Sequence, residues 1–484
     1  MKTAGILMPI SSMPSEHGIG DFGKNSYDFI DRCKKNGIKI WQILPLNPLG
    51  YGNSPYQPYS SFAGDELYIS LEQLKEEGIL KELKTLQNTK ENNAIDYPSA
   101  RAHKEFYLKK AYENFKPDAA YGEFVKREWV FLYAVYITFK KANELHCWNE
   151  WKEEEKNWIT DRELSLHGYE EAIGYEMFVQ YIFYKQWMRL KKYANNCGIK
   201  IMGDMPFYVG IDSLDVWANQ KCFLLDEKGF PTFIAGVPPD YFSKTGQRWG
   251  NPIYDWDYLK KTDYDFWMKR LSYAGELFDI VRIDHFRAFD TYWKIPVSCP
   301  TAEVGEWIEA PGHEVFHKIQ KELKNVEIVV EDLGDLRPEV LKLRDDFHLK
   351  GMKVVQFTFD PKENNSNFKD KENMIIYTGT HDNQTTRGWF LSQGFFKKCS
   401  IKRYMFFHGY RYKKISHSFI AYAFDSIATI AIVPMQDIIG LSDEGRINTP
   451  GTLGSPNWEW RLLNFKTFDE NIEILKTMIV KSGR

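Results

Sequence analysis

Short runs of apolar, often β-branched residues recur along the chain, and most are followed by a loop and then by a helical pattern. Runs of this length, separated by helices, predict strands that are buried on both faces of a parallel sheet. Eight can be recognised, at residues 5–10, 38–44, 199–204, 279–284, 326–330, 353–359, 374–377 and 427–433. Eight strands that alternate with helices predict the α/β class and, within it, a (β/α)8 TIM barrel.

Two of the connections are much longer than the others. Residues 66–196, between the second and third predicted strands, are mostly helical in pattern, and aromatic side chains recur at i, i+3, i+4 spacing within 123–140 and 171–195. That spacing is typical of a helix packing face and predicts a large helical insertion subdomain. Residues 217–256, after the third strand, are rich in Gly, Pro and aromatic residues, which predicts a structured active-site loop insertion.

After the eighth predicted strand the chain has a loop, 436–460, and a short predicted helix, 469–479. These residues are too few to build a C-terminal β-sandwich domain, so we expect none. We interpret residues 1–484 as a single catalytic barrel that carries the two insertions.

Composition and charge narrow the class of protein. The formal net charge is −3 and basic and acidic residues are interleaved, so the whole-chain balance indicates neither a nucleic-acid partner nor an anionic membrane surface. The chain contains no run of about eighteen apolar residues, so the sequence predicts no membrane span. The six cysteines are scattered without a Cys-x-x-Cys pair, which favours reduced thiols in a cytoplasmic protein. Aromatic residues make up 16% of the chain and suit stacking against sugar rings.

The predicted strand 279–284 has one charged face. Val281 and Ile283 alternate with Arg282 and Asp284, so the guanidinium and the carboxylate share a side of the strand. The arginine can satisfy a buried carboxylate and favours its ionised form. The pair is either a structural ion pair or an oriented glycosyl nucleophile with its partner.

Three carboxylic acids close predicted strands: Asp284 the fourth, Glu331 the fifth and Asp382 the seventh. Active sites of α/β barrels lie at the carboxyl ends of the strands, so the three acids are expected at one mouth. Mutual repulsion would keep the most desolvated acid protonated while another stays ionised, which is the division of labour in retaining glycoside chemistry.

Two other interpretations of the acids stay open at this point. Three carboxylates also suit a Mg²⁺ site that stabilises an enediolate, although the cations Arg282, Arg287 and Arg387 disfavour a metal there. Each acid could instead cap the helix that follows its strand. We expect no metal and no nucleotide or flavin cofactor, since the chain has no Gly-x-Gly-x-x-Gly after a strand and no Walker pattern.

Several motifs resemble those of one enzyme family. Val281-Arg-Ile-Asp-His-Phe-Arg287, Glu331-Asp-Leu-Gly334 and Thr378-Gly-Thr-His-Asp-Asn383 are similar to the catalytic motifs of the 4-α-glucanotransferases, also called amylomaltases or disproportionating enzymes, in glycoside hydrolase family 77. Further similar stretches are 54–60, 203–209, 236–243, 246–252, 448–452 and Asn457-Trp458, so the resemblance covers nearly the whole chain.

The resemblance implies Asp284 as the nucleophile, Glu331 as the general acid/base and Asp382 as the stabiliser of the transition state. It implies sugar contacts from these residues: Arg282, His381, Asp204 and the stacking ring of Tyr59 at the cleavage point, and Tyr241, Phe242, Gln247 and Trp249 in a loop over the acceptor side.

The implied reaction is transfer of α-1,4-glucan segments from maltooligosaccharides, starch or glycogen-derived glucans to the 4-OH of another glucan or of glucose. An α-amylase-type retaining hydrolase is the nearest alternative, but such enzymes usually carry a C-terminal β-domain. A non-catalytic glucan-binding protein is an alternative of another class, and it would have no need for three mutually repelling carboxylates.

Overall fold

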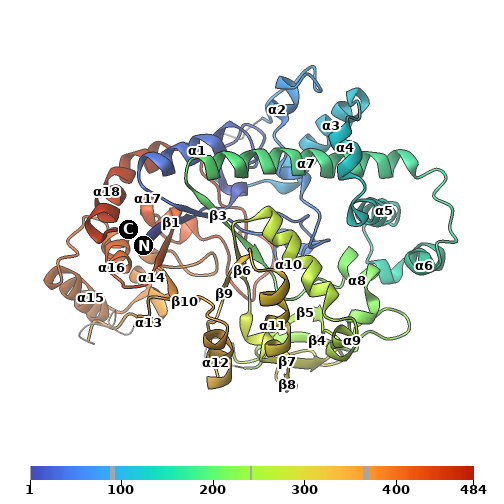
Figure 1. Cartoon of the computed structure of the whole chain (residues 1–484). Coiled ribbons are helices and arrows are strands. Elements are labelled where there is room, and N and C mark those ends of the chain that lie inside the picture. The colour runs from blue at the N-terminus through green and yellow to red at the C-terminus, as the bar shows by residue number, and fades with distance from the viewer. Residues whose placement is uncertain (1, 88–92, 240–242, 363–369) are drawn as a thin grey trace.

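The computed structural model describes residues 2–87, 93–239, 243–362 and 370–484. Its centre is a sheet of eight parallel strands in the order β10–β11–β12–β1–β2–β3–β6–β9 (Figure 1). The strands are β1 (Thr3–Leu7), β2 (Ile40–Gln42), β3 (Lys200–Met205), β6 (Ile280–Ile283), β9 (Glu327–Val330), β10 (Gly351–Val354), β11 (Met374–Tyr377) and β12 (Ile430–Pro434). The Val330 N–H donates to the carbonyl of Lys350 at 2.9 Å and joins β9 to the residues that lead into β10. The sheet therefore closes, and the predicted (β/α)8 fold is confirmed.

Helices surround this sheet (Figure 1). Those that follow the barrel strands are α1 (Lys24–Lys35), α9 (Trp256–Lys261), α10 (Asp265–Leu277), α11 (Gly312–Glu322), α12 (Pro338–Asp346), α13 (Val355–Thr358), α14 (Thr386–Ser392), α15 (Phe395–Phe407), α16 (Ile415–Phe424), α17 (Met435–Ile439) and α18 (Lys466–Ser482). Between β2 and β3 lie α2 (Leu71–Glu76), α3 (Tyr97–Asn114), α4 (Ala119–Phe124), α5 (Glu128–Ala142), α6 (Glu153–Asp161) and α7 (Glu170–Asn196).

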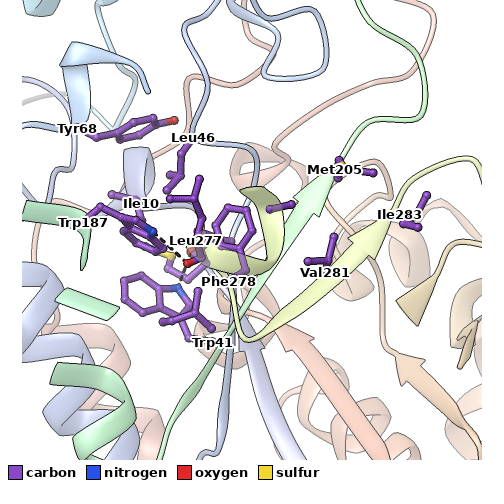
Figure 2. Packing of buried hydrophobic residues seen from close by; sticks show 14 of the residues in the cluster. Ile10, Trp41, Leu46, Tyr68, Trp187, Met205, Leu277, Phe278, Val281 and Ile283 are labelled. Atoms are coloured by element: carbon purple, nitrogen blue, oxygen red, sulfur yellow. Dashed lines mark hydrogen bonds between the residues drawn. The ribbon is translucent and has the colours of Figure 1, made fainter. Parts of the chain in front are cut away.

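The two faces of the barrel strands are buried in different surroundings, as expected for parallel strands. Met202, Ile280 and Val329 belong to a cluster inside the barrel, whereas Val281 and Ile283 belong to the larger cluster outside it. Figure 2 shows Trp41 and Trp187 beside Leu277 and Phe278 in this outer cluster. The indole N–H of Trp187 donates to the carbonyl of Leu277 at 3.1 Å, so the ring fills the core without leaving its polar atom unpaired.

Two of the predicted stretches divide into more than one element in the structure. The predicted strand 353–359 is too long: β10 ends at Val354, and the chain turns into α13, where the Phe359 N–H donates to the carbonyl of Val355 at 2.9 Å. The helical stretch 123–140 is two helices, because α4 ends at Phe124 and α5 begins at Glu128. Apolar spacing alone does not locate such breaks.

A second sheet lies beside the barrel (Figure 1). Its four antiparallel strands have the order β5–β4–β7–β8. The short helix α8 (Leu214–Ala218), β4 (Phe233–Val237) and β5 (Gln247–Pro252) precede β6, and β7 (Thr291–Pro296) and β8 (Glu306–Glu309) follow it. The strands β4 and β5 lie within 217–256, which is predicted as a structured loop insertion, and β7 and β8 are not predicted from the sequence. The sheet therefore connects the segments before and after β6, the strand that carries Arg282.

In the described residues after β12, the chain forms helices and turns and no strand of a further sheet. None of the helices in the described ranges is both long enough and apolar enough to cross a membrane.

Candidate functional site

The predicted acids lie where barrel strands end. The backbone N–H of Asp284, just after β6, donates to the carbonyl of Met205 at 3.0 Å. The N–H of Glu331, just after β9, donates to the carbonyl of Ile283 at 2.9 Å. These bonds continue the pairing of β3 with β6 and of β6 with β9. Asp284 and Glu331 therefore start at neighbouring positions on the carboxyl edge of the barrel.

Arg282 is the cation at the centre of this edge. Its side chain is buried, and Nη1 donates to both carboxylate oxygens of Asp204 at 2.6 and 2.7 Å and to Oδ1 of Asp284 at 2.9 Å. Asp204 and Arg282 are direct partners in the β3–β6 register. The alternation along the strand thus placed the guanidinium and the carboxylate correctly on one face, and Asp204 completes the ion-paired group.

Glu331 has no side-chain cation as a hydrogen-bond partner in the described part of the chain. Its Oε2 accepts from the backbone N–H of His285 at 2.9 Å, and Oε1 accepts from the N–H of Leu333 at 3.1 Å. Burial and the neighbouring charge of Asp284 raise the pKa of Glu331 to about 8. A carboxyl group with that pKa holds a proton at neutral pH and can donate it.

Asp382 follows β11 and is held by groups from the loop after β12. Its Oδ1 accepts from the side-chain amide of Asn448 at 2.7 Å, and its carbonyl accepts from Arg446 at 3.0 Å. The Nε2 atom of the adjacent His381 lies 3.4 Å from its Oδ2. Asp382 is the most exposed of these carboxylates, with a side chain 45% accessible. It can therefore face a ligand that enters from solvent.

Tyr56 links these groups across the mouth. Its hydroxyl donates to Oδ2 of Asp204 at 2.8 Å and lies 3.5 Å from Nδ1 of His381. Its ring stacks on the imidazole of His381, with centroids 5.0 Å apart and an interplanar angle of 17°. Trp458 packs beside both rings, at centroid distances of 5.8 and 5.9 Å. Tyr56 thus joins the strand that carries Asp204 to the loop that carries Asp382.

Tyr59, the ring predicted to stack on sugar, contacts Lys140 in the structure. The ammonium of Lys140 is 4.7 Å from its ring centroid, and Lys140 also pairs with Asp212 at 2.6 Å. The ring is therefore part of a contact with α5. Within the motif Ser54-Pro-Tyr-Gln-Pro-Tyr-Ser60, the side chain that reaches Asp204 and His381 is Tyr56.

The predicted acceptor loop reaches the acids through Trp249. Its indole ring meets the imidazole of His285 edge to face, with centroids 4.8 Å apart, and its N–H donates to Oε1 of Gln247 at 3.1 Å. His285 in turn donates its backbone N–H to Glu331. The other two residues predicted for this loop, Tyr241 and Phe242, lie outside the described residues.

Three residues of the site are not predicted from the sequence: Tyr56, His285 and Asn448. Each lies within a stretch that carried the family resemblance, so the signal was present. The sequence alone does not show which of these side chains contact the acids, because the tertiary structure determines their directions.

Chemically, the site places one carboxylate on a buried guanidinium and beside it one carboxyl group that stays protonated near neutral pH. That combination supplies a nucleophile and a proton donor to one bond. The guanidinium also occupies the position between Asp204 and Asp284 that a divalent cation would need.

Comparison with known proteins agrees with this chemistry. The family model described as 4-alpha-glucanotransferase matches residues 8–466. The chain is 41% identical to a 4-alpha-glucanotransferase of Thermus thermophilus, over all of this chain and 99% of that protein. It is 37% identical to the chloroplastic/amyloplastic 4-alpha-glucanotransferase of Arabidopsis thaliana, over 98% of this chain and 83% of that protein. Its structure matches an amylomaltase from Streptococcus agalactiae in complex with acarbose, with a TM-score of 0.93, 35% identity and full coverage of both chains.

Proposed function

Since the chain belongs to the 4-alpha-glucanotransferases of glycoside hydrolase family 77, we propose that it transfers α-1,4-glucan segments by a retaining double displacement through Asp284 and Glu331. Donors would be maltooligosaccharides, starch or glycogen-derived glucans, and the acceptor would be the 4-OH of another glucan or of glucose. The observation that carries the mechanism is the pairing of a guanidinium-bound Asp284 with a Glu331 whose pKa is raised to about 8.

In the first step Glu331 gives its proton to the glycosidic oxygen while an oxygen of Asp284 attacks the anomeric carbon. The C–O bond to the leaving glucan breaks, and a covalent glycosyl-enzyme with inverted configuration forms. Arg282 supports this step because its hydrogen bond orients the attacking carboxylate.

In the second step the ionised Glu331 takes the proton of the acceptor 4-OH, whose oxygen attacks the anomeric carbon and releases Asp284. Two inversions restore the α linkage. Water could attack in the same way, so transfer needs an acceptor side that binds sugar well. Positioning can be worth an effective molarity of roughly 10⁵ M or more, far above that of water.

We assign the remaining residues to the sugar. Asp382 would stabilise the oxocarbenium-like transition state, and His381, Asp204 and Arg282 would hold hydroxyl groups at the cleavage point. The stacking role goes to Tyr56, because its ring contacts His381 and its hydroxyl contacts Asp204. Gln247 and Trp249 would form the acceptor side, since Trp249 contacts His285 beside Glu331.

We also propose a division of the chain and a location. Residues 1–484 would act as one catalytic barrel, with 66–196 as a helical insertion and 217–256 as an active-site insertion. The helices α2–α7 and the strands β4 and β5 support these two insertions. A cytoplasmic location is supported by the six cysteines, all of which are free thiols.

The test is incubation of the purified protein with maltotriose in the presence of a chelator, with products resolved by length and with glucose and reducing ends assayed. A ladder of longer maltooligosaccharides plus glucose, at constant total reducing ends, is the expected result. Rising reducing ends without longer products would make the protein a hydrolase. No reaction would favour the non-catalytic glucan-binding alternative.

A further inference from the structure

One long segment of the chain has a one-sided charge. From Asn383 to Phe424 there are eight basic residues and no acidic residue, although the whole chain has a net charge of −3. The whole-chain balance hides this segment, because acidic residues elsewhere outweigh it. The segment forms α14, α15 and α16.

The helix α15 forms the middle of this segment and has apolar residues on both its inward and its outward side. Its inward side is the buried set Ile401, Tyr404 and Met405. Its outward side is not polar throughout: Phe395 and Phe396 are 72 and 87% exposed, and Phe406 and Phe407 are 53 and 69% exposed. The two phenylalanine pairs stand about 16 Å apart along the helix axis.

Between and beside these pairs lie cations without acidic partners. Lys402 and Arg403 are exposed in the middle of α15. Across the described residues, no carboxylate forms an ion pair with any of Lys397, Lys398, Lys402, Arg403, Arg411 and Lys413. Arg411 instead lies over the Phe406 ring at 4.1 Å, and Arg403 lies 5.7 Å from that of Phe407. This face of α15 is thus both apolar and cationic.

The helix lies at the outer edge of the molecule, on the side of α13 and α16 (Figure 1). The exposed side chains of α15 therefore lie at the periphery of the molecule. A second copy of the chain would set the cations of this face against the same cations in a two-fold contact, which charge repulsion disfavours.

Phenylalanine side chains beside Lys and Arg on an exposed helix are the composition that interfacial helices use on anionic bilayers. The rings enter the boundary between headgroups and acyl chains, and the cations remain among the headgroups. We propose that the exposed face of α15, formed by Phe395, Phe396, Lys402, Arg403, Phe406 and Phe407, is a docking surface for a bilayer that contains anionic phospholipids. Docking would bring the transferase to a membrane surface through the side chains of this helix.

The experiment is flotation of the full-length protein with vesicles of phosphatidylglycerol and phosphatidylcholine, compared with vesicles of phosphatidylcholine alone. We expect binding to the anionic vesicles that is lost at high salt, and none to the neutral ones. Each cation near the bilayer should strengthen binding to the anionic vesicles about fivefold, so Lys402→Gln with Arg403→Gln should weaken that binding about twentyfold or more. Phe395→Ser with Phe396→Ser should weaken it at least about tenfold.

A matched control lies on α3. Phe106 is 53% exposed and the Lys110 ammonium lies 4.4 Å from its ring centroid. Unlike the cations of α15, however, Arg101, Lys104 and Lys109 of this helix form ion pairs with Asp65, Asp21 and Glu105. Phe106→Ser with Lys110→Gln should leave flotation unchanged. Maltotriose disproportionation by each variant checks that the barrel is intact.

A second readout does not depend on a substitution in the face. Cys399 is the exposed cysteine among the six and lies on α15, so an environment-sensitive fluorophore there should shift to the blue when anionic vesicles are added. The proposal would be overturned if the protein did not float with anionic vesicles at low salt. It would also be overturned if the α3 control variant lost as much vesicle binding as the α15 variants. Binding to single-stranded RNA without flotation would overturn it too, as would a wild-type dimer that Phe395→Ser with Phe396→Ser converts to a monomer.

Discussion

Replacement of Glu331 by Gln is expected to stabilise the folded protein at alkaline pH while it removes activity. Burial and the charge of Asp284 raise the pKa of Glu331 from 4.5 to about 8. A carboxyl group whose pKa rises on folding holds its proton more tightly in the folded state. Its contribution to stability is complete below about pH 4.5 and is lost as the pH rises through about 8. The ionised group is therefore most costly above pH 8, where an amide removes the charge.

The size of the effect follows from the same pKa. The difference between 4.5 and about 8 corresponds to at most about 5 kcal/mol, at ~1.36 kcal/mol for each pKa unit. Because the side chain is partly exposed, solvent screening reduces this to about 1–3 kcal/mol. The amide accepts less well from His285 and Leu333, which costs roughly 1 kcal/mol, but that cost is the same at every pH. A comparison between two pH values therefore isolates the charge.

The assay is scanning calorimetry of the wild type and Glu331→Gln at pH 5 and pH 9, at one scan rate. The unfolding entropy of a chain of this length is about 1 kcal/mol/K, so the Tm difference between variant and wild type should rise by about 1–3 °C from pH 5 to pH 9. Glu227→Gln, at an exposed position, is the control and should show no such change. An equal difference at both pH values, or a larger one at pH 5, would refute the electrostatic account of Glu331.

Four further outcomes are expected from the site. The kcat/KM for maltotriose should fall above about pH 8, because the first step needs protonated Glu331; a profile flat to pH 9.5 would contradict this. Asp284→Asn should reduce transfer by at least about 10³-fold while calorimetry still detects maltooligosaccharide binding, and retained activity would remove its role as nucleophile. Trp249→Ala should raise the ratio of reducing-end release to transfer, and an unchanged ratio would exclude this ring from acceptor binding. Tyr56→Ala should lower kcat/KM at least about tenfold more than Tyr59→Ala, and the reverse order would return the stacking role to Tyr59.

Much of the barrel could be predicted from the sequence because strands buried on both faces are apolar along their whole length. Where the local pattern is ambiguous, the prediction failed. The run 353–359 mixes Lys353, Gln356 and Thr358 with Val and Phe; only its first two residues belong to β10, and the rest leads into α13. The strands β7 and β8 mix Lys and Glu with Trp and lack a clear period of two, so nothing in their sequence separates them from loops.

The same distinction holds within the site. Asp284 and Glu331 could be assigned to the mouth because each directly follows a strand, and the barrel fixes where strands end. The two tyrosines of the motif at 54–60 could not be told apart in this way. They are three residues apart in an irregular segment, where neither a strand nor a helix fixes the direction of a side chain. A turn closed by the Gln57 N–H on the carbonyl of Ser54 directs Tyr56 to Asp204 and leaves Tyr59 against Lys140.

Asp284 and Glu331 have different roles because they accept hydrogen bonds from different kinds of donor. Asp284 accepts from a guanidinium that Asp204 holds in place from the neighbouring strand. Glu331, one strand further along, accepts from two backbone N–H groups and, among the described residues, from no cation, and it bears the repulsion of Asp284 besides its own burial. Backbone dipoles orient a carboxyl group but compensate a negative charge less than a cation does. One arginine shared between β3 and β6 is thus enough to make two chemically identical groups differ, and the difference is what a double displacement requires.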